Sequence, residues 1–296
     1  GLVYEVVWAR QLVLVFGNTT QAVSAILTGF FGGLALGSMI GGRVADRIAR
    51  PLRLYGLLEV VLVGVVLVMP LTFDLLHELY RGVYPGLSTI PVALALVRFL
   101  LAIIALAPAT ILMGATLPAL TRFLTARDDL GGAFSRLYAA NTIGAIAGTS
   151  IAGFVLIEVF GLGGALLLGA SGSGIAGLVA LLLDRVTPPR GRLLTHTPEP
   201  GAAARVRELR LALALAFLSG LTSVGYQVVW NRLLALGSGN PTYVFTLILT
   251  LFLTGLALGA LLQGVIRPRV RSVVAVIAGG QVFTAVFGLV GAAILS

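Results

Sequence analysis

The sequence predicts an all-α membrane protein that crosses the bilayer many times and carries an internal repeat. Hydrophobic residues make up 58% of the 296 positions and charged residues only 10%, and the mean hydropathy is +1.05. Soluble domains carry about 25% charged residues. The apolar residues occur in recurring runs of the length that a transmembrane helix needs. We therefore predict a polytopic helix bundle.

The internal repeat relates residues 4–42 to residues 226–264 at a constant offset, without a gap. About half of the aligned positions are identical. The identities include Tyr4 with Tyr226, Trp8 with Trp230, Arg10 with Arg232, and Asn18 with Asn240. Shared apolar composition can explain matches of Leu and Val, but not aligned Trp, Arg and Asn. The chain is thus predicted to contain two copies of a large module, which is common in membrane transport folds.

Apolar runs separated by polar segments predict nine membrane spans. In order, we place them at 1–16, 20–42, 53–72, 91–121, 138–159, 161–183, 210–236, 243–266 and 273–295. The fourth is long and contains Pro108 and Pro118, so we expect a kink there, or a span followed by a short amphipathic turn. The first span begins inside a helical pattern and the last ends in an apolar run, so we expect the chain to be part of a longer protein.

The arginines predict the orientation of the spans. All 20 basic residues are Arg, and most lie in four alternate loops of the nine-span arrangement: 43–53, 122–136, 184–210 and 267–271. The positive-inside rule places these loops in the cytoplasm. We expect the protein to lie in the inner (plasma) membrane. Six spans separate the starts of the two copies, so both copies cross in the same direction, as a parallel repeat.

This arrangement divides the chain into three parts. Residues 1–183 form a first six-helix membrane half, residues 184–209 a cytoplasmic linker rich in Pro, Gly and Arg, and residues 210–296 the first three helices of a second half.

Several kinds of chemistry are excluded or disfavoured by composition. Without Cys or Lys the chain offers neither a thiolate nor a lysine Schiff base, and its two His and few carboxylates argue against a metal site. We expect no catalytic residue and no cofactor in this chain. The net charge of +9 does not indicate nucleic-acid binding, because the arginines follow the loops. Gly172, Gly174 and Gly177 match G-x-G-x-x-G but lie inside an apolar span, where no dinucleotide site forms.

Charged residues inside the predicted spans are the strongest indication of function, because each is costly in lipid unless it is paired or hydrated. They are Glu5, Arg10, Glu59, Arg98, Glu158 and Arg232. Glu5 becomes Gln227 in the second copy, so the shared scaffold does not require a carboxylate there. A carboxylate with aromatic neighbours suits a cationic ligand or proton coupling. The candidate ligand-binding residues are Tyr4, Glu5, Trp8, Glu59, Tyr226, Gln227 and Trp230. The alternative is a structural ion pair, Glu5 with Arg98 or Glu59 with Arg10.

A second candidate site follows the second span, in the segment GSMIGGRVADRIARPLR. This segment resembles the major facilitator signature, in which an Asp and basic residues lock neighbouring helix ends on the cytoplasmic side. Asp46, Arg47, Arg50 and Arg53 would form such a latch, unless they are ordinary residues of a cytoplasmic loop. The second copy keeps the arginines and lacks the Asp.

Small residues at four-residue spacing predict close helix packing. Such stripes comprise Gly29, Gly33, Gly37 and Gly41 in the second span, and Gly169, Ser173 and Gly177 in the sixth. Asn18-Thr19-Thr20 reads formally as a glycosylation sequon, and we expect it to be a helix cap in an outer loop.

The strings LVYEVVWARQLVLVFGNTTQAVS, GLALGSMIGGRVADR, ILMGATLPALTRFL and RLYAANTIGAIAGT resemble the membrane region of bacterial fused major-facilitator-like/spermidine synthase proteins. The resemblance implies a major-facilitator-like bundle that precedes a soluble, C-terminal spermidine-synthase-like domain. That domain would transfer an aminopropyl group from decarboxylated S-adenosylmethionine to putrescine.

Three functions remain open on this evidence. The first is the membrane domain of a spermidine-synthase-like protein, which anchors the synthase and binds or passes a polyamine or another small cation. The second is a stand-alone secondary transporter of the major facilitator type. The third is a structural membrane scaffold that binds only the lipid bilayer.

Overall fold

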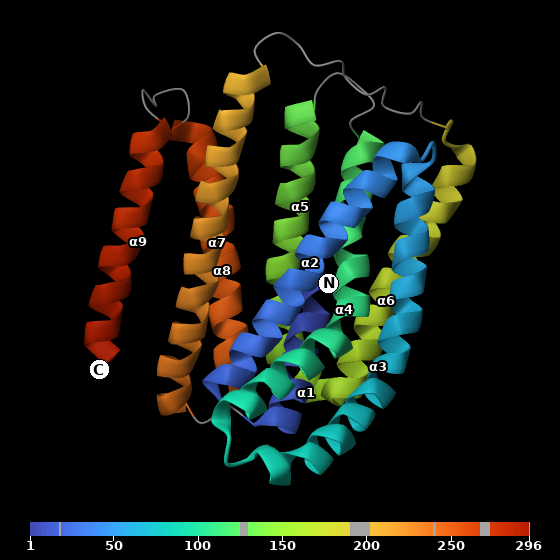
Figure 1. Cartoon of the computed structure of the whole chain (residues 1–296). Coiled ribbons are helices and arrows are strands. Elements are labelled where there is room, and N and C mark those ends of the chain that lie inside the picture. Colours follow the sequence, from blue (N-terminus) through green and yellow to red (C-terminus); the bar gives the residue numbers. More distant parts are fainter. Residues whose placement is uncertain (18, 125–129, 190–201, 239–240, 267–272, 296) are drawn as a thin grey trace. The chain divides into compact units, whose positions relative to one another are not determined.

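The computed structural model describes residues 1–17, 19–124, 130–189, 202–238, 241–266 and 273–295. These residues form helices and no strand, so the predicted all-α class is confirmed. In chain order they are α1 (Leu2–Phe16), α2 (Thr20–Arg47), α3 (Pro51–Leu87), α4 (Pro91–Leu124), α5 (Leu130–Ile151), the π-helix η1 (Ala152–Leu156), α6 (Ile157–Val186), α7 (Ala202–Ser238), α8 (Pro241–Ile266) and α9 (Val273–Leu295) (Figure 1).

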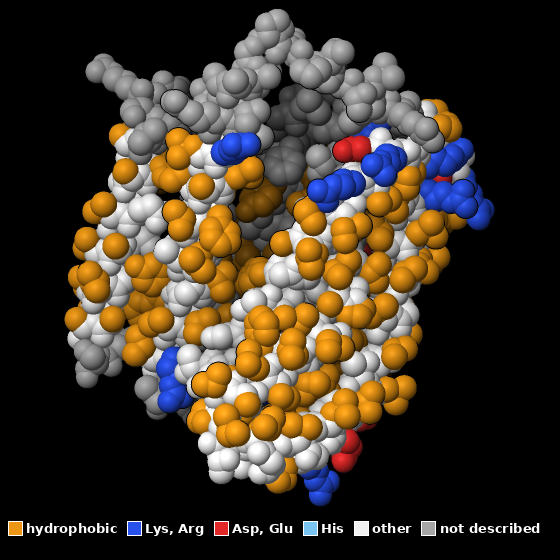
Figure 2. Space-filling view, in the orientation of Figure 1, with side chains coloured by type: hydrophobic (Ala, Val, Ile, Leu, Met, Phe, Trp, Pro, Cys, Tyr) orange, Lys and Arg blue, Asp and Glu red, His pale blue; other side chains and the backbone are white. Residues whose placement is uncertain are grey.

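The chain is a membrane protein by the length and composition of its helices. In the described part of the chain, seven helices are long and apolar enough to cross a bilayer. This number treats Ser135–Val186 as a single run of 52 residues and omits α1, which has only 15 residues. Apolar side chains cover the flanks of the helices, and charged side chains gather near helix ends (Figure 2). Nine crossings remain a prediction.

The long run Ser135–Val186 folds back on itself near its middle. Gly161 has φ 68° and ψ −178°, a backbone conformation that residues with a Cβ rarely adopt. A methyl group placed on Gly148 would lie 3.5 Å from Val3, and one on Gly169 would lie 3.3 Å from Val3. In one straight helix, residues 148 and 169 would lie about 31 Å apart. Both can contact Val3 only because the chain reverses between them.

The chain divides into two compact units, Gly1–Ala202 and Ala203–Ser296. The first contains α1 to α6 and the second contains α7 to α9. The boundary between them falls within the predicted linker, residues 184–209. The parallel repeat and its major-facilitator-like arrangement remain predictions.

Within the first unit, α2 and α4 form the most extensive helix pair, and the predicted glycine stripe of α2 is their contact surface. A Cβ on Gly29 would meet Ile103 at 3.5 Å, and one on Gly41 would meet the Cβ of Ala115 at 2.5 Å. Between them, a Cβ on Gly37 would collide with the backbone carbonyl of Ile111. Residue numbers increase together along both helices, so α2 and α4 run parallel. The packing role predicted for this stripe is confirmed.

In the predicted small-residue stripe of α6, Gly177 packs closely against α3, as does Gly174 outside the stripe, whereas Gly169 and Ser173 contact α1. A Cβ on Gly177 would lie 3.0 Å from the backbone oxygen of Gly56, and one on Gly174 would lie 3.7 Å from Val63. Residue numbers rise along α3 as they fall along α6, so this pair is antiparallel. Close backbone approach of this kind is what small residues permit in lipid, where no hydrophobic effect drives helices together.

The structure differs from the predicted spans most clearly in α3. The helix was expected to end near residue 72, but it continues to Leu87 with Pro70 and Pro85 inside it. Figure 1 shows that α3 bends partway along its length, as expected where a proline removes a backbone hydrogen bond from the helix. A straight helix of its 37 residues would be about 55 Å long, well beyond the roughly 30 Å hydrocarbon core.

Candidate functional site

Two aromatic residues of α1 form a buried pair in the first unit. Tyr4 and Trp8 lie one turn apart and stack with ring centroids 5.3 Å apart and an interplanar angle of 15°. The Tyr4 hydroxyl donates to the Ser173 hydroxyl at 3.2 Å, and its ring lies against Gly169, where a Cβ would be 2.8 Å from Tyr4 Cε1. The stripe of α6 that was predicted only to pack therefore also holds Tyr4 in place.

Glu5 is next to this pair in sequence and is 1% exposed. Neither carboxylate oxygen has a hydrogen-bond partner among the described residues. An unpaired carboxylate in an apolar interior costs several kcal/mol, on the order of the penalty for removing one ion from water.

Arg98, one predicted partner of Glu5, is engaged elsewhere. Its Nε donates to the Tyr80 hydroxyl at 2.8 Å, its guanidinium lies 5.6 Å from the Tyr80 ring centroid, and its Nη1 donates to Thr19 Oγ1 at 3.4 Å. Thr19 is also the N-cap of α2 and accepts from the backbone N–H of Ala22 at 3.2 Å. The predicted capping role of this segment is confirmed at Thr19, while Asn18 lies outside the described residues.

Further buried polar atoms lie near Glu5 in sequence or on the neighbouring helix α5. Trp8 Nε1, Gln11 Oε1 and Thr149 Oγ1 have no hydrogen-bond partner within the described ranges. Glu5, Trp8 and Gln11 follow one another at three-residue spacing, which places them within about 120° around α1. Sequence reasoning missed Gln11 and Thr149. The three-residue spacing of Gln11 from Trp8 could have identified Gln11 as a residue on the same side of the helix. Nothing in the sequence distinguished Thr149.

Glu59, the second candidate carboxylate, lies on α3 and faces α6. A Cβ on Gly177 would lie 3.0 Å from Glu59 Cβ. Gly177 is one turn from Ser173, the residue that Tyr4 contacts, so Tyr4 and Glu59 pack on successive turns of α6. The ion pairs found in the described chain include neither Glu59 with Arg10 nor Glu5 with Arg98.

The three remaining candidates, Tyr226, Gln227 and Trp230, lie on α7 in the second unit. The Tyr226 ring packs on α9, where a Cβ on Gly288 would lie 2.8 Å from Tyr226 Cε1, and the Trp230 ring packs on Gly291. Gln227 is 2% exposed, and neither polar atom of its amide has a partner among the described residues. Both units thus place a buried, unsatisfied polar side chain directly after a tyrosine that packs on glycine.

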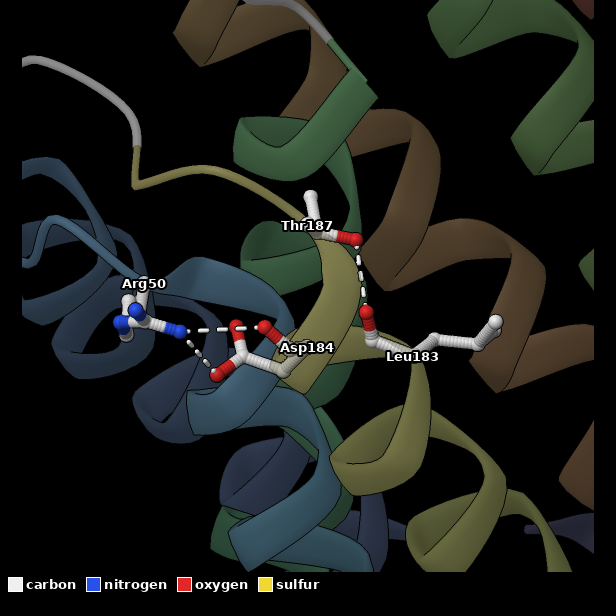
Figure 3. A network of polar contacts seen from close by, with 4 residues as sticks. All are labelled: Arg50, Leu183, Asp184 and Thr187. Atoms are coloured by element: carbon white, nitrogen blue, oxygen red, sulfur yellow. Dashed lines mark hydrogen bonds and ion pairs between the residues drawn. The ribbon is translucent and has the colours of Figure 1, made fainter.

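Among the predicted latch residues, Arg50 forms an ion pair, and its partner is Asp184 rather than Asp46. Arg50 donates through Nη1 to Asp184 Oδ2 at 2.9 Å and to the Asp184 backbone oxygen at 3.0 Å, as Figure 3 shows. Asp46, Arg47 and Arg53 are exposed and take part in no ion pair in the described part of the chain. Sequence reasoning found Arg50 but missed Asp184, because 134 positions separate them.

The Arg50–Asp184 contact ties the start of α3 to the end of α6. Arg50 is the N-cap residue of α3, and Asp184 lies in the last turn of α6. The guanidinium binds both a side-chain oxygen and a carbonyl of this last turn, where carbonyls lack partners within the helix and the helix dipole favours a cation. We call this contact of Arg50 with Asp184, which links two helix ends, the Arg50–Asp184 clamp.

We expect Arg50→Gln to lower thermal stability, because Asp184 is only 6% exposed and would lose its partner. The loss should be about 1 kcal/mol, since the arginine side chain is 38% exposed and solvent screens the pair. Detergent-solubilised protein would be heated and its remaining monodisperse fraction measured. Arg53→Gln is the matched control and should change nothing. Equal effects of the two variants would mean that the contact contributes no stability.

Comparison with known proteins finds sequence similarity to a curated protein. The chain is similar to Polyamine aminopropyltransferase 2 of Streptomyces coelicolor (strain ATCC BAA-471 / A3(2) / M145), with 32% identity over 203 residues. The match covers 67% of this chain and 34% of the relative, so the chain spans about a third of the length of the curated relative it matches. No protein-family model matches the chain, and no solved structure matches it.

Proposed function

We propose that this chain is the membrane region of a polyamine aminopropyltransferase-like protein and that Glu5 binds a polyamine or a related small cation. The observation that carries the proposal is the buried Glu5 carboxyl group, which has no hydrogen-bond partner in the described structure and is next in sequence to Tyr4 of a stacked Tyr–Trp pair. A carboxylate with aromatic neighbours in a medium of low dielectric constant is suited to an organic ammonium group. The similarity to a polyamine aminopropyltransferase supports a polyamine as the cation.

Aminopropyl transfer itself is assigned to a part of the protein outside this chain. The relative is about three times as long as its match, which leaves room for a soluble synthase-like domain beyond the membrane region. The chain would anchor that domain and deliver or retain a polyamine at the membrane. Because Glu5 is 1% exposed, a cation reaches it only when the helices around α1 separate. Such a motion would separate the ends of α3 and α6, which the Arg50–Asp184 clamp joins.

The test is spermidine binding by the chain in lipid nanodiscs, measured by isothermal titration calorimetry. We expect Glu5→Gln to weaken binding by roughly 10–100-fold, since a charge-assisted contact contributes about 1.5–3 kcal/mol. Gln occupies the aligned position 227, so the substitution fits the helix pattern. Glu158→Gln, which removes an exposed carboxylate, is the control and should bind as the parent does.

The alternatives predict different outcomes. Equal spermidine affinity of the parent and Glu5→Gln would contradict a ligand role for Glu5. A stand-alone secondary transporter would give saturable, Glu5-dependent uptake by proteoliposomes that contain this chain alone. A structural scaffold would give neither binding nor uptake.

A further inference from the structure

The second half of α3, residues 71–87, carries three different faces. Its inner face is buried and consists of Phe73, Leu76 and Tyr80. A second face is charged or polar and exposed, with Asp74, His77, Glu78 and Arg81. A third face is apolar and exposed: Leu71 at 69%, Leu75 at 62%, Leu79 at 50% and Val83 at 41%. The four apolar residues recur at four-residue spacing, so they form one continuous stripe along the helix.

The inner face fixes this segment firmly to the first unit. The Tyr80 ring contacts Phe16 of α1 edge-on, with centroids 5.1 Å apart. The Tyr80 hydroxyl accepts from Arg98 of α4, and Arg98 also reaches Thr19, the N-cap of α2. The segment is therefore not a free extension of α3. It is held by α1 and by Arg98 of α4, which in turn reaches the N-cap of α2.

These contacts also define where the segment lies along the spans. Phe16 is the last residue of α1 and Thr19 caps the start of α2, so Tyr80 contacts the turn between two consecutive helices. We predict that α1 crosses the bilayer as α2 does, and a turn between spanning helices lies at the membrane–water boundary, because irregular backbone cannot face hydrocarbon. α3, which contains Pro70, bends partway along its length (Figure 1), and the bend directs its second half away from the line of the preceding span.

We propose that residues 71–87 form an interfacial helix that lies in the plane of one membrane face, with Leu71, Leu75, Leu79 and Val83 inserted among lipid acyl chains. An apolar stripe next to a charged face is the arrangement by which a helix rests at the headgroup boundary. The occupant of the stripe is lipid, because the helix continues without a linker from a membrane span and its inner face is already covered by the protein. Tyr80 and Tyr84 add the aromatic residues typical of that depth.

Site-directed spin labelling tests this placement, because the 296 residues contain no Cys. Single variants Leu71→Cys, Leu75→Cys, Leu79→Cys and Val83→Cys would be labelled with a nitroxide and reconstituted in phosphatidylcholine–phosphatidylglycerol liposomes. Collision with oxygen and with a water-soluble nickel complex then gives the depth of each label. Glu78→Cys is the water-facing control, and Val61→Cys, on the exposed face of the preceding span, is the control for the hydrocarbon core.

An in-plane helix places all four labels at one shallow depth, with oxygen collisions exceeding nickel collisions. Val61→Cys should be deeper, and Glu78→Cys should favour nickel. A helix that continued across the membrane would instead change depth by about 6 Å at each position and about 18 Å from residue 71 to residue 83, which would overturn the proposal. Dominant nickel collisions along the stripe, or protection from both reagents by a second copy or another protein segment, would also overturn it.

A second measurement does not depend on purification or labelling yield. In native membranes, a membrane-impermeant maleimide presented to both faces should react with Glu78→Cys and not with Leu75→Cys. Detergent should expose Leu75→Cys to the reagent. Equal reaction of both variants in intact membranes would contradict burial of the stripe in lipid.

Discussion

Replacing Glu5 by Leu is expected to stabilise the protein in the absence of ligand. The Glu5 carboxyl group is buried, and neither of its oxygens has a hydrogen-bond partner among the described residues. Removing an unsatisfied buried polar group of similar volume gains about 1–3 kcal/mol, and replacing buried ionic groups by apolar ones is often stabilising. The temperature at which detergent-solubilised protein loses its monodisperse peak should therefore rise.

The same variant separates a ligand site from a structural ion pair. If Glu5 paired with a buried arginine, its loss would destabilise the protein by about 3–5 kcal/mol. Spermidine should raise the transition temperature of the parent and leave that of Glu5→Leu unchanged, because a ligand stabilises only the state that binds it. Glu158→Leu, at an exposed position, should behave as the parent in both respects. A fall in stability for Glu5→Leu would restore the ion-pair hypothesis.

Adding a single methyl group at Gly37 is expected to disrupt the first unit. A Cβ there would collide with the backbone carbonyl and Cα of Ile111, and neither can move without shifting α4 as a whole. Inserting atoms into a close-packed interface costs about 1–3 kcal/mol, and more when backbone must move. We therefore expect Gly37→Ala to reduce the folded yield in membranes and to lower the transition temperature by several degrees.

The same helix contains the matched control for this prediction. Gly32 has nothing within 4 Å of an added Cβ, so Gly32→Ala adds the same methyl group to α2 without a collision. It should be neutral or slightly stabilising, because Ala favours helix more than Gly does. Fluorescence-detected size-exclusion chromatography of the two variants compares them directly. Equal profiles would mean that α2 and α4 approach less closely than the structure shows.

The sequence predicted the parts of the fold that depend on local pattern. Hydropathy and length identified the apolar helices, and the glycine spacing in α2 identified the face that meets α4. The break between the fifth and sixth predicted spans, near residue 160, coincides with the sequence Gly-Leu-Gly-Gly in an apolar run. The structure has its break at the first of these glycines, Gly161, which adopts a positive φ. Each of these properties is encoded within a few turns of chain, so no tertiary information was needed.

Local pattern was insufficient where a proline could either end or bend a helix. The third span was predicted to end at residue 72, just after Pro70, whereas α3 continues to Leu87, and Phe73, Leu76 and Tyr80 are buried in this continuation. A proline costs one hydrogen bond and a clash, and tertiary contacts can outweigh both. The interfacial segment was therefore not predicted from the sequence.

Pairing between distant residues was decided by the tertiary structure alone. The sequence indicated which residues are unusual: Glu5 and Arg98 inside apolar spans, and Arg50 in the arginine-rich segment after the second span. The sequence could not assign their partners. Arg98 binds Tyr80 and Thr19, and Arg50 binds Asp184. These partners are far apart in sequence, and helix periodicity carries no information over such distances. Composition and periodicity determined the membrane class and the helices of this protein. The packing of those helices decided which buried polar groups form hydrogen bonds. It left the Glu5 carboxyl group without one among the described residues.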